Sequence, residues 1–210
     1  MNDPGPLSTC SFYICRMEIV FASNNAHKLR EVRSRLPSAF RILPLSEVLG
    51  EVDIPETGDT LDANATIKAR HVFERTGRNC FADDTGLEIN ALDGRPGVYS
   101  ARYAGANCSF QDNMDKILRE MADIDDRSAS FRTVICLILN GREHLFEGRV
   151  DGGILESGRG EEGFGYDPVF RPKGFAETFA EMPIEQKNKI SHRGRAVGKL
   201  VDFLNSAQVV

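Results

Sequence analysis

The sequence lacks any apolar run long enough to cross a membrane. Its longest aliphatic run, residues 134–139, spans six of the 210 residues, whereas a transmembrane helix needs roughly 18 or more. The sequence also lacks an excess of positive charge, since 26 Lys and Arg stand against 31 Asp and Glu, which gives a net charge of −5. We therefore expect no membrane-spanning role and no nucleic-acid partner, and any polyanion must be held by a local site.

No CxxC pair is present, and no cysteine spacing is typical of a zinc site. The cysteines form an odd set, which indicates reduced thiols and a cytoplasmic protein: Cys10, Cys15, Cys80, Cys108 and Cys136. Residues 1–16 also lack the basic start and the long apolar stretch of a signal peptide. Because a clean strand pattern begins at Met17, we expect residues 1–16 to be an N-terminal extension, either disordered or a tag, and residues 17–210 to form a single domain.

Apolar residues make up 41% of the chain, and their spacing alternates between strand and helix patterns. These patterns predict strands at 17–22, 42–45, 79–83, 87–92, 130–140 and 142–150, with helices at 29–36, 60–75, 110–121 and from 191 onward. The helix at 110–121 is expected to bury four side chains, Phe110, Met114, Ile117 and Met121. Asn140-Gly141 predicts a tight hairpin. The mixed order of elements predicts an α/β fold with parallel and antiparallel strand pairs.

The first candidate for chemistry follows the first strand, at the start of a helix. It consists of Ser23, Asn24, Asn25, Ala26, His27 and Lys28. The exposed N–H groups and the positive end of the helix dipole favour an anion there, and Lys28 adds a charge. The segment is not a Walker P-loop, because no GxxxxGK[ST] is present. An ordinary helix cap with a solvated lysine is the alternative.

The second candidate is acidic and consists of Glu56 and the adjacent pair Asp83 and Asp84. Neighbouring carboxylates repel each other, and a cation or a basic neighbour relieves that repulsion. Oxygen ligands in small number suit Mg²⁺, which keeps several waters and binds phosphate oxygens. In a strand the two aspartates point to opposite faces, so one of them reaches a given site. A solvated turn is the alternative.

Two further segments could recognise a nucleobase. Residues 163–168 place Phe164 between two glycines, where a ring can stack on a base while Asp167 accepts from a base N–H. Residues 187–193 carry three cations and a histidine, and Lys or Arg donors suit the O6 and N7 edge of a 6-oxo purine. A turn packed on the core and a solvated basic run are the respective alternatives.

Taken together, these segments resemble the inosine triphosphate pyrophosphatase family. The resemblance covers residues 17–204 and depends on ordered motifs: Ser23-Asn24-Asn25 with Lys28 and Glu31, Glu56-Thr57-Gly58 followed by Asn64-Ala65 and Lys68-Ala69, residues 82–87, residues 96–103, residues 163–168 and Ser191-His192-Arg193. It implies an enzyme that hydrolyses ITP, dITP and XTP to the monophosphate and pyrophosphate and so cleanses the nucleotide pool. It also implies an elongated mixed sheet flanked by helices, two lobes around a central nucleotide-binding cleft, Mg²⁺ as cofactor and a homodimer.

The resemblance also assigns roles residue by residue. Ser23 through Lys28 are expected to hold the phosphates, Glu56 and Asp84 to bind Mg²⁺, and Asp84 to act as the general base. The other residues are expected to contact the substrate: Thr85, Phe164, Gly165, Tyr166, Asp167, Lys187, His192 and Arg193. Within that set, Phe164 stacks on the base, and Lys187, His192 and Arg193 read its oxo edge. Asp83 is expected to support the site.

Two other functions remain open at this point. A Maf-like nucleotide pyrophosphatase shares the architecture, but the Ser-His-Arg and Phe-Gly-Tyr-Asp motifs argue against it. A noncatalytic nucleotide sensor would bind without turnover, and the pair Glu56 and Asp84 argues against it because a binding module needs no positioned base.

Overall fold

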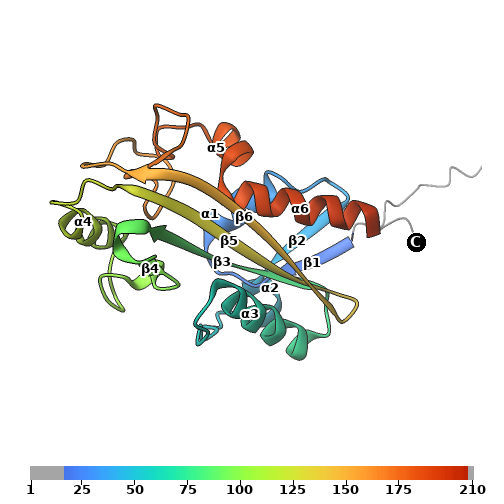
Figure 1. Cartoon of the computed structure of the whole chain (residues 1–210). Coiled ribbons are helices and arrows are strands. Elements are labelled where there is room, and N and C mark those ends of the chain that lie inside the picture. Colours follow the sequence, from blue (N-terminus) through green and yellow to red (C-terminus); the bar gives the residue numbers. More distant parts are fainter. Residues whose placement is uncertain (1–16, 208–210) are drawn as a thin grey trace, which may run out of the picture.

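One long curled sheet forms the frame of the molecule, and a computed structural model describes it within residues 17–207 (Figure 1). The strands are β1 (Met17–Phe21), β2 (Phe40–Pro44), β3 (Cys80–Ile89), β4 (Pro96–Gly97), β5 (Ser128–Leu139), β6 (Arg142–Ile154) and β7 (Phe170–Pro172). The helices are α1 (Ala26–Arg33), α2 (Leu45–Leu49), α3 (Leu61–Thr76), α4 (Phe110–Glu120), α5 (Ile184–Ile190) and α6 (His192–Ala207). The predicted mixed α/β fold is confirmed. The expected N-terminal extension, with Cys10 and Cys15, lies outside the described residues.

The strand order, β2-β1-β3-β5-β6-β7, leaves an opening along β3. The parallel neighbour β1 pairs with β3 only at Cys80 and Phe81, and the antiparallel β4 pairs with it only at Leu87 and Glu88. Between these contacts, residues 82–86 pair with β5 alone among the described strands. Ligands of open α/β sheets bind beyond the carboxyl ends of parallel strands. The gap between β1 and β4 is therefore the natural place for a site.

Strand β3 corrects one prediction, because residues 79–83 and 87–92 do not form two short strands around Asp84-Thr85-Gly86. A single strand runs through the segment, since β5 pairs with every residue from Cys80 to Ile89. Residues 90–92 form a 3₁₀ turn instead of the end of a strand. Gly86 permits the close approach of β4, because a Cβ at that position would lie 2.7 Å from the carbonyl oxygen of Gly97.

The two long helices pack as their sequence patterns predict. Thr60 caps α3 by accepting a hydrogen bond from the Ala63 N–H. The apolar stripe that helical spacing gives this segment is buried, and it consists of Leu61, Ala65, Ala69 and Val72. Helix α6 buries Ala196, Leu200 and Leu204 against the sheet. The Asn140-Gly141 hairpin is confirmed, with φ of 50° and 77° at its two residues.

Helix α4 departs from its predicted pattern at its first residue. Ser109 and Asp112 form a capping box that fixes the first turn, and Met114 and Ile117 are buried as predicted. Phe110, which was also expected in the core, is 46% exposed. Its ring projects from the end of the helix, beyond the apolar face that the next turns press against the sheet.

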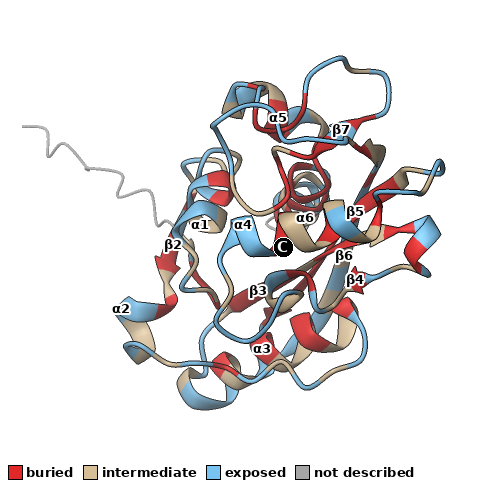
Figure 2. Cartoon of the chain, turned by 90° about the vertical axis from the view of Figure 1, so that its left-hand side faces the viewer, coloured by how far each residue is buried: buried red, intermediate tan, exposed pale blue. Residues whose placement is uncertain are grey.

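Three apolar clusters make up the cores of two lobes, and Figure 2 shows buried segments in the strands between α3 and α6. One cluster lies between the sheet and α3, and a second lies between the sheet and α6. The third joins α4 and β7 to the C-terminal half of β3 and the N-terminal half of β5. Along β3, Ala82 belongs to the cluster with α3 and Leu87 to the cluster with α4, so residues 83–86 lie at the junction. Within residues 17–207, no helix has the length and apolarity needed to cross a bilayer.

Candidate active site

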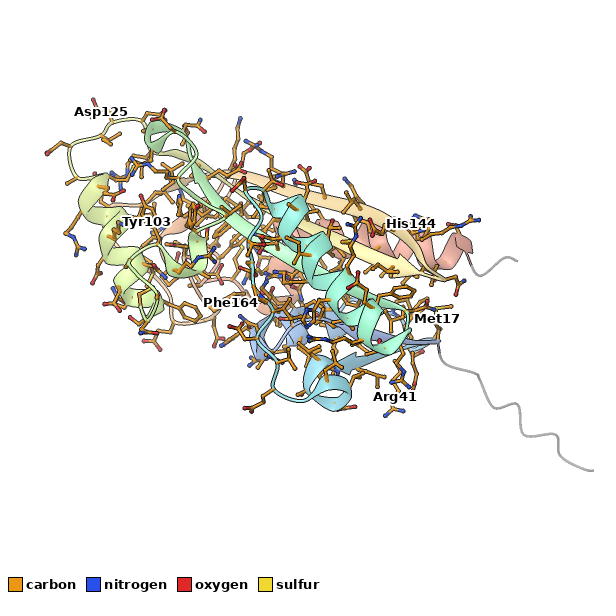
Figure 3. All side chains as sticks on the ribbon, turned by 90° about the horizontal axis from the view of Figure 1, so that it is seen from below. Met17, Arg41, Tyr103, Asp125, His144 and Phe164 are labelled. Carbon is orange, nitrogen blue, oxygen red and sulfur yellow. The ribbon has the colours of Figure 1, made fainter. Side chains whose placement is uncertain are left out.

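A cavity of about 140 Å³ lies at this junction, and side chains from both lobes line it. Most of the predicted site residues face it: Asn25, Lys28, Glu56, Asp84, Thr85, Phe164, Gly165, Tyr166, Asp167, Lys187, His192 and Arg193. Ser23, Asn24 and Ala26 line a separate hollow on the other side of the β1–α1 turn. His27 lies next to the cavity wall, against Phe164. Figure 3 shows Phe164 in the middle of the molecule's length, on the side of α4.

The turn after β1 serves both as a helix cap and as one end of the cavity. Asn25 Oδ1 accepts hydrogen bonds from the N–H groups of His27 and Lys28, at 2.9 and 3.1 Å. Asn24 Nδ2 donates to the Val52 carbonyl at 3.0 Å, away from the cavity. Lys28 Nζ donates to Asp83 Oδ1 at 2.9 Å, and burial lowers the pKa of Lys28 despite this attraction. Asn25 and Lys28 are thus the members of the segment that face the cavity.

The adjacent aspartates point to opposite faces of β3, as their place in a strand requires. Asp83 contacts Lys28 on one face, and Asp84 Oδ1 accepts from Lys68 Nζ at 3.2 Å on the other. The same Lys68 Nζ donates to Glu56 Oε1 at 2.5 Å. Burial raises the pKa of Asp84. For Glu56, burial acts in the same direction, but the attraction of Lys68 outweighs it and lowers the pKa.

The oxygen donors beside Lys68 fit a hard divalent cation. Asp84 is 6% exposed, and within residues 17–207 its Oδ2 is buried with no hydrogen-bond partner in normal geometry, although the Asn64 amide lies near enough to act on the pKa of the carboxylate. A buried carboxylate oxygen normally has a partner, so a group from outside the described chain has a reason to bind there. In residues 17–207 no three His, Cys, Asp or Glu side chains gather around one point. Two carboxylates with room for water and phosphate oxygens suit Mg²⁺ better than a cation that needs a full protein cage.

The loop of residues 163–168, which carries aromatic and acidic side chains, forms a further wall of the cavity. Gly163 has φ of +80°, and a Cβ there would lie 2.2 Å from Asp167 Oδ2, so only glycine fits. This turn lets the Phe164 N–H donate to Asp167 Oδ2 at 2.8 Å. The Tyr166 hydroxyl donates to the Ser100 carbonyl at 2.7 Å and ties the loop to the segment after β4. Phe164 is left with its ring facing the cavity.

A chain of buried ion pairs supports that wall. Lys187 Nζ donates to Asp167 Oδ2 and to Glu31 Oε1, both at 2.7 Å. Arg193 donates to Glu31 Oε2, to Asp83 Oδ2 at 3.1 Å and to Thr85 Oγ1 at 3.2 Å. A guanidinium has five N–H donors and an ammonium has three. Two donors of Arg193 and one of Lys187 therefore remain for a ligand.

His192 lies in the wall of the cavity as a neutral imidazole ring. It is 4% exposed and stacks on Phe131 with a centroid distance of 4.5 Å. Burial, together with the neighbouring Arg193, holds the pKa of His192 well below its usual range. Its Nδ1 is buried with no hydrogen-bond partner in the described chain. A neutral imidazole with a free nitrogen can exchange a hydrogen bond with a ligand in the cavity.

Sequence reasoning gave no role to Glu31 and Lys68, which organise the site. Lys68 lies on the buried face of α3, between Ala65 and Ala69, and Glu31 precedes the buried Val32 on α1. A charged residue on an apolar helix face is rarely buried unless it is paired. That signal was present in the sequence for both residues.

The Glu31 ion pairs predict a pH dependence of stability. Burial acts to raise the pKa of Glu31, but Arg193 and Lys187 outweigh it and lower the value from its usual 4.5. The stabilisation is complete above the unfolded-state pKa and is lost as the pH falls through the lower folded-state pKa. We expect the free energy of unfolding of the native chain to exceed that of Glu31→Gln at pH 7, and this difference to shrink steadily below pH ~4.5.

Urea unfolding of both proteins between pH 7 and pH 3 measures that difference. The exposed Glu156→Gln is the control and should track the native chain at every pH. A gap between the native chain and Glu31→Gln that stays constant with pH would contradict the ion-pair assignment.

Comparison with known proteins shows the family of this chain. The model of the Ham1 family matches residues 19–203. A dITP/XTP pyrophosphatase of Flavobacterium psychrophilum is 50% identical over 190 residues, 90% of this chain and 100% of that protein. One from Porphyromonas gingivalis is 50% identical over 192 residues, 91% and 99% of the two chains.

Solved structures agree with this family. The Ham1 protein of Staphylococcus aureus is 39% identical with a TM-score of 0.83, and the HAM1 protein of Coxiella burnetii is 42% identical with a TM-score of 0.84. Each match covers 90% of this chain and 99% of the other. The family resemblance drawn from the motifs is confirmed.

Proposed function

The chain belongs to the Ham1 family, and on that premise we propose that it hydrolyses the noncanonical purine nucleoside triphosphates ITP, dITP and XTP to monophosphate and pyrophosphate. The observation that carries the proposal is the buried Asp84 oxygen, unpartnered within residues 17–207, in the lining of a cavity that also has Lys28 at the α1 end and Phe164 on an aromatic wall. The relatives named dITP/XTP pyrophosphatase support the same reaction. A Maf-like enzyme would leave the family match without explanation.

In this proposal the phosphates bind between α1 and α3. Lys28 and the positive end of the α1 dipole offer positive charge at one side, and Lys68 adds charge from behind Glu56 and Asp84, to which it donates. Glu56 and Asp84 would hold Mg²⁺, which when bound neutralises phosphate charge and lowers the pKa of water. The ion pairs of Lys28 with Asp83 and of Lys68 with Glu56 keep both ammonium groups in place before the substrate arrives.

Asp84 acts as the general base. Its Oδ2 is free to accept the proton of the attacking water, because Lys68 occupies only Oδ1. Burial raises the pKa of Asp84, and a base is more effective as its pKa approaches the working pH. Lys68 keeps the carboxylate ionised and fixes its orientation, so that the free oxygen faces the cavity.

The purine base of the substrate binds between Phe164 and the two buried cations, Lys187 and Arg193. Lys187 and Arg193 retain three N–H donors for the O6 edge of hypoxanthine or xanthine. Adenine presents an amino group at that edge, so the donors would lose their partner, and such a loss gives large selectivity. The cavity volume of about 140 Å³ is below the 300–1,000 Å³ of typical ligand pockets, so the site must widen to admit a whole nucleotide.

The test is incubation with ITP, XTP, GTP and ATP in Mg²⁺, with chromatography of the nucleotide product and separate assays for pyrophosphate and phosphate. We expect monophosphate and pyrophosphate from ITP and XTP, and rates with ATP lower by at least about a hundredfold. Release of diphosphate and phosphate would contradict the bond assignment. Tight ITP binding without turnover would favour the nucleotide sensor. The homodimer and the cytoplasmic location stay predictions.

A further inference from the structure

The rim of the cavity carries a large apolar side chain that the fold does not bury. Phe110, the first residue of α4, is 46% exposed and lines the cavity. Exposed apolar residues are common singly, but one that faces a cavity is informative because it marks a surface that a ligand can cover. The ring centroid of Phe110 lies 6.1 Å from that of Phe164, with an angle of 49° between the planes.

The core of the α4 lobe does not explain the position of Phe110. Met114 and Ile117, one and two turns later on the same helix, are buried in the cluster of that lobe. Phe110 is not a member of that cluster. The capping box of Ser109 and Asp112 fixes the first turn of the helix, so the ring is held at the rim by a defined local structure.

Phe164, on the other side of the rim, is supported from outside the cavity. His27 does not line the cavity, and its ring stacks on Phe164 with a centroid distance of 5.1 Å and an interplanar angle of 26°. The support comes from α1, whereas Phe110 begins α4. Two aromatic rings from segments far apart in the chain, the 163–168 loop and the start of α4, therefore face the same space.

We infer that Phe110 contacts the purine nucleoside of the substrate, as a second aromatic wall opposite Phe164. The inference rests on the proposed function and adds a specificity residue to it. Phe110 offers no charge and no hydrogen bond, so it suits the apolar face of the base rather than a phosphate group, for which Lys28 lies at the α1 end of the cavity. A planar base between two rings needs about 7 Å between them, at a carbon contact distance of ~3.5 Å. The two rings, whose centroids are 6.1 Å apart with 49° between their planes, therefore need to separate by about 1 Å and to turn toward parallel to hold the base.

The absence of tryptophan from the chain makes the contact measurable. Phe110→Trp introduces a single indole, whose fluorescence we expect inosine monophosphate to quench in a saturable titration. Ribose 5-phosphate, which has the sugar and phosphate without the base, should leave the fluorescence unchanged. Leu145→Trp is the matched control, because Leu145 is 53% exposed and does not line the cavity; its fluorescence should not respond to either compound.

Steady-state kinetics give a second readout. Phe110→Ala is expected to raise KM for ITP by about 5- to 150-fold, the range that loss of one base–aromatic stack gives, with a smaller change in kcat. Leu145→Ala should leave both constants unchanged. Phe110→Tyr should restore KM to near the native value, which a role in folding alone would not explain if all variants melt at similar temperatures.

The outcomes separate the inference from the proposed function. A native chain that hydrolyses ITP, an unchanged KM in Phe110→Ala and no quenching in Phe110→Trp would overturn the inference and leave the function standing. A native chain inactive on every triphosphate would overturn the function. In that case the titration with inosine monophosphate still decides whether Phe110 contacts the nucleoside.

Discussion

Replacement of Asp84 by asparagine is expected to lower kcat for ITP by about 10²- to 10⁴-fold, the contribution of a positioned general base. The amide has nearly the same shape as the carboxylate but accepts no proton from water. Lys68 keeps its ion pair with Glu56 at 2.5 Å, so the phosphate end of the cavity stays charged and ordered. Nucleotide binding should therefore change far less than turnover. Single-turnover kinetics for the chemical step and calorimetric titration for binding measure the two effects separately.

Asp123→Asn provides the control for the Asp84 variant. Asp123 is an exposed aspartate in the turn after α4, so the same chemical change there should leave kcat and binding as they are. A kcat near the native value in Asp84→Asn would remove Asp84 as the base. Loss of binding in parallel with turnover would instead assign Asp84 mainly to holding the substrate and its cation.

Local patterns predicted much of the fold because the elements that they describe are locally determined. The stripe on α3, its Thr60 cap and the Asn140-Gly141 hairpin depend on residues within one or two turns of each other. The break expected at Asp84-Thr85-Gly86 was wrong because the decisive contact is distant. Strand β5 pairs along the whole of β3, and this ladder overrides the turn tendency of the Thr-Gly sequence.

Phe110 shows the same limit for a helix. Its spacing from Met114 and Ile117 is that of a core residue, and periodicity alone assigns it to the buried face. Burial also depends on where the helix begins relative to the sheet beneath it. Helix α4 starts at the edge of the cavity, so its first residue extends past the core, which no local pattern indicates.

The motifs indicated which segments meet, and the structure shows how they are joined. Arg193 and Glu31 are 162 residues apart in the chain, and Arg193 and Asp83 are 110 apart. Pairings at such separations are set by the tertiary fold, and a single sequence does not reveal them. The result is a continuous ionic chain from Lys28 through Asp83, Arg193 and Glu31 to Lys187, which ends on the carboxylate that holds the Phe164 backbone.

This ionic chain joins the phosphate end of the cavity to the wall that holds the base. Its charges are almost fully removed from water, and a buried charge is tolerated when its partners are fixed around it. A ligand that takes the free donors of Lys187 and Arg193 therefore meets groups that are already oriented. Such preorganisation reduces the entropy lost on binding. It also means that the geometry of the nucleobase pocket changes when any residue of the ionic chain is removed.

Removal of Arg193 should consequently affect stability as strongly as specificity. Arg193→Ala leaves Glu31 and Asp83 without their shared partner, and both lie at 6% exposure or less. Breaking a buried pair by removing one partner costs about 3–5 kcal/mol. For a chain of this size that corresponds to a fall in melting temperature of about 6–20 °C.

Calorimetric melting of Arg193→Ala and of Glu31→Gln, singly and combined, measures that cost. The double variant should be more stable than the sum of the single losses implies, because the buried Glu31 carboxylate that loses one of its two cationic partners in Arg193→Ala is no longer charged. Lys199→Ala, an exposed position on the same helix, is the control and should melt within about 2 °C of the native chain. Strictly additive losses would show that Arg193 and Glu31 contribute independently, contrary to the shared ion pair in the structure. Arg193→Lys, which keeps the charge but not the planar fork, should fold better than the alanine variant and still discriminate ITP from ATP less well.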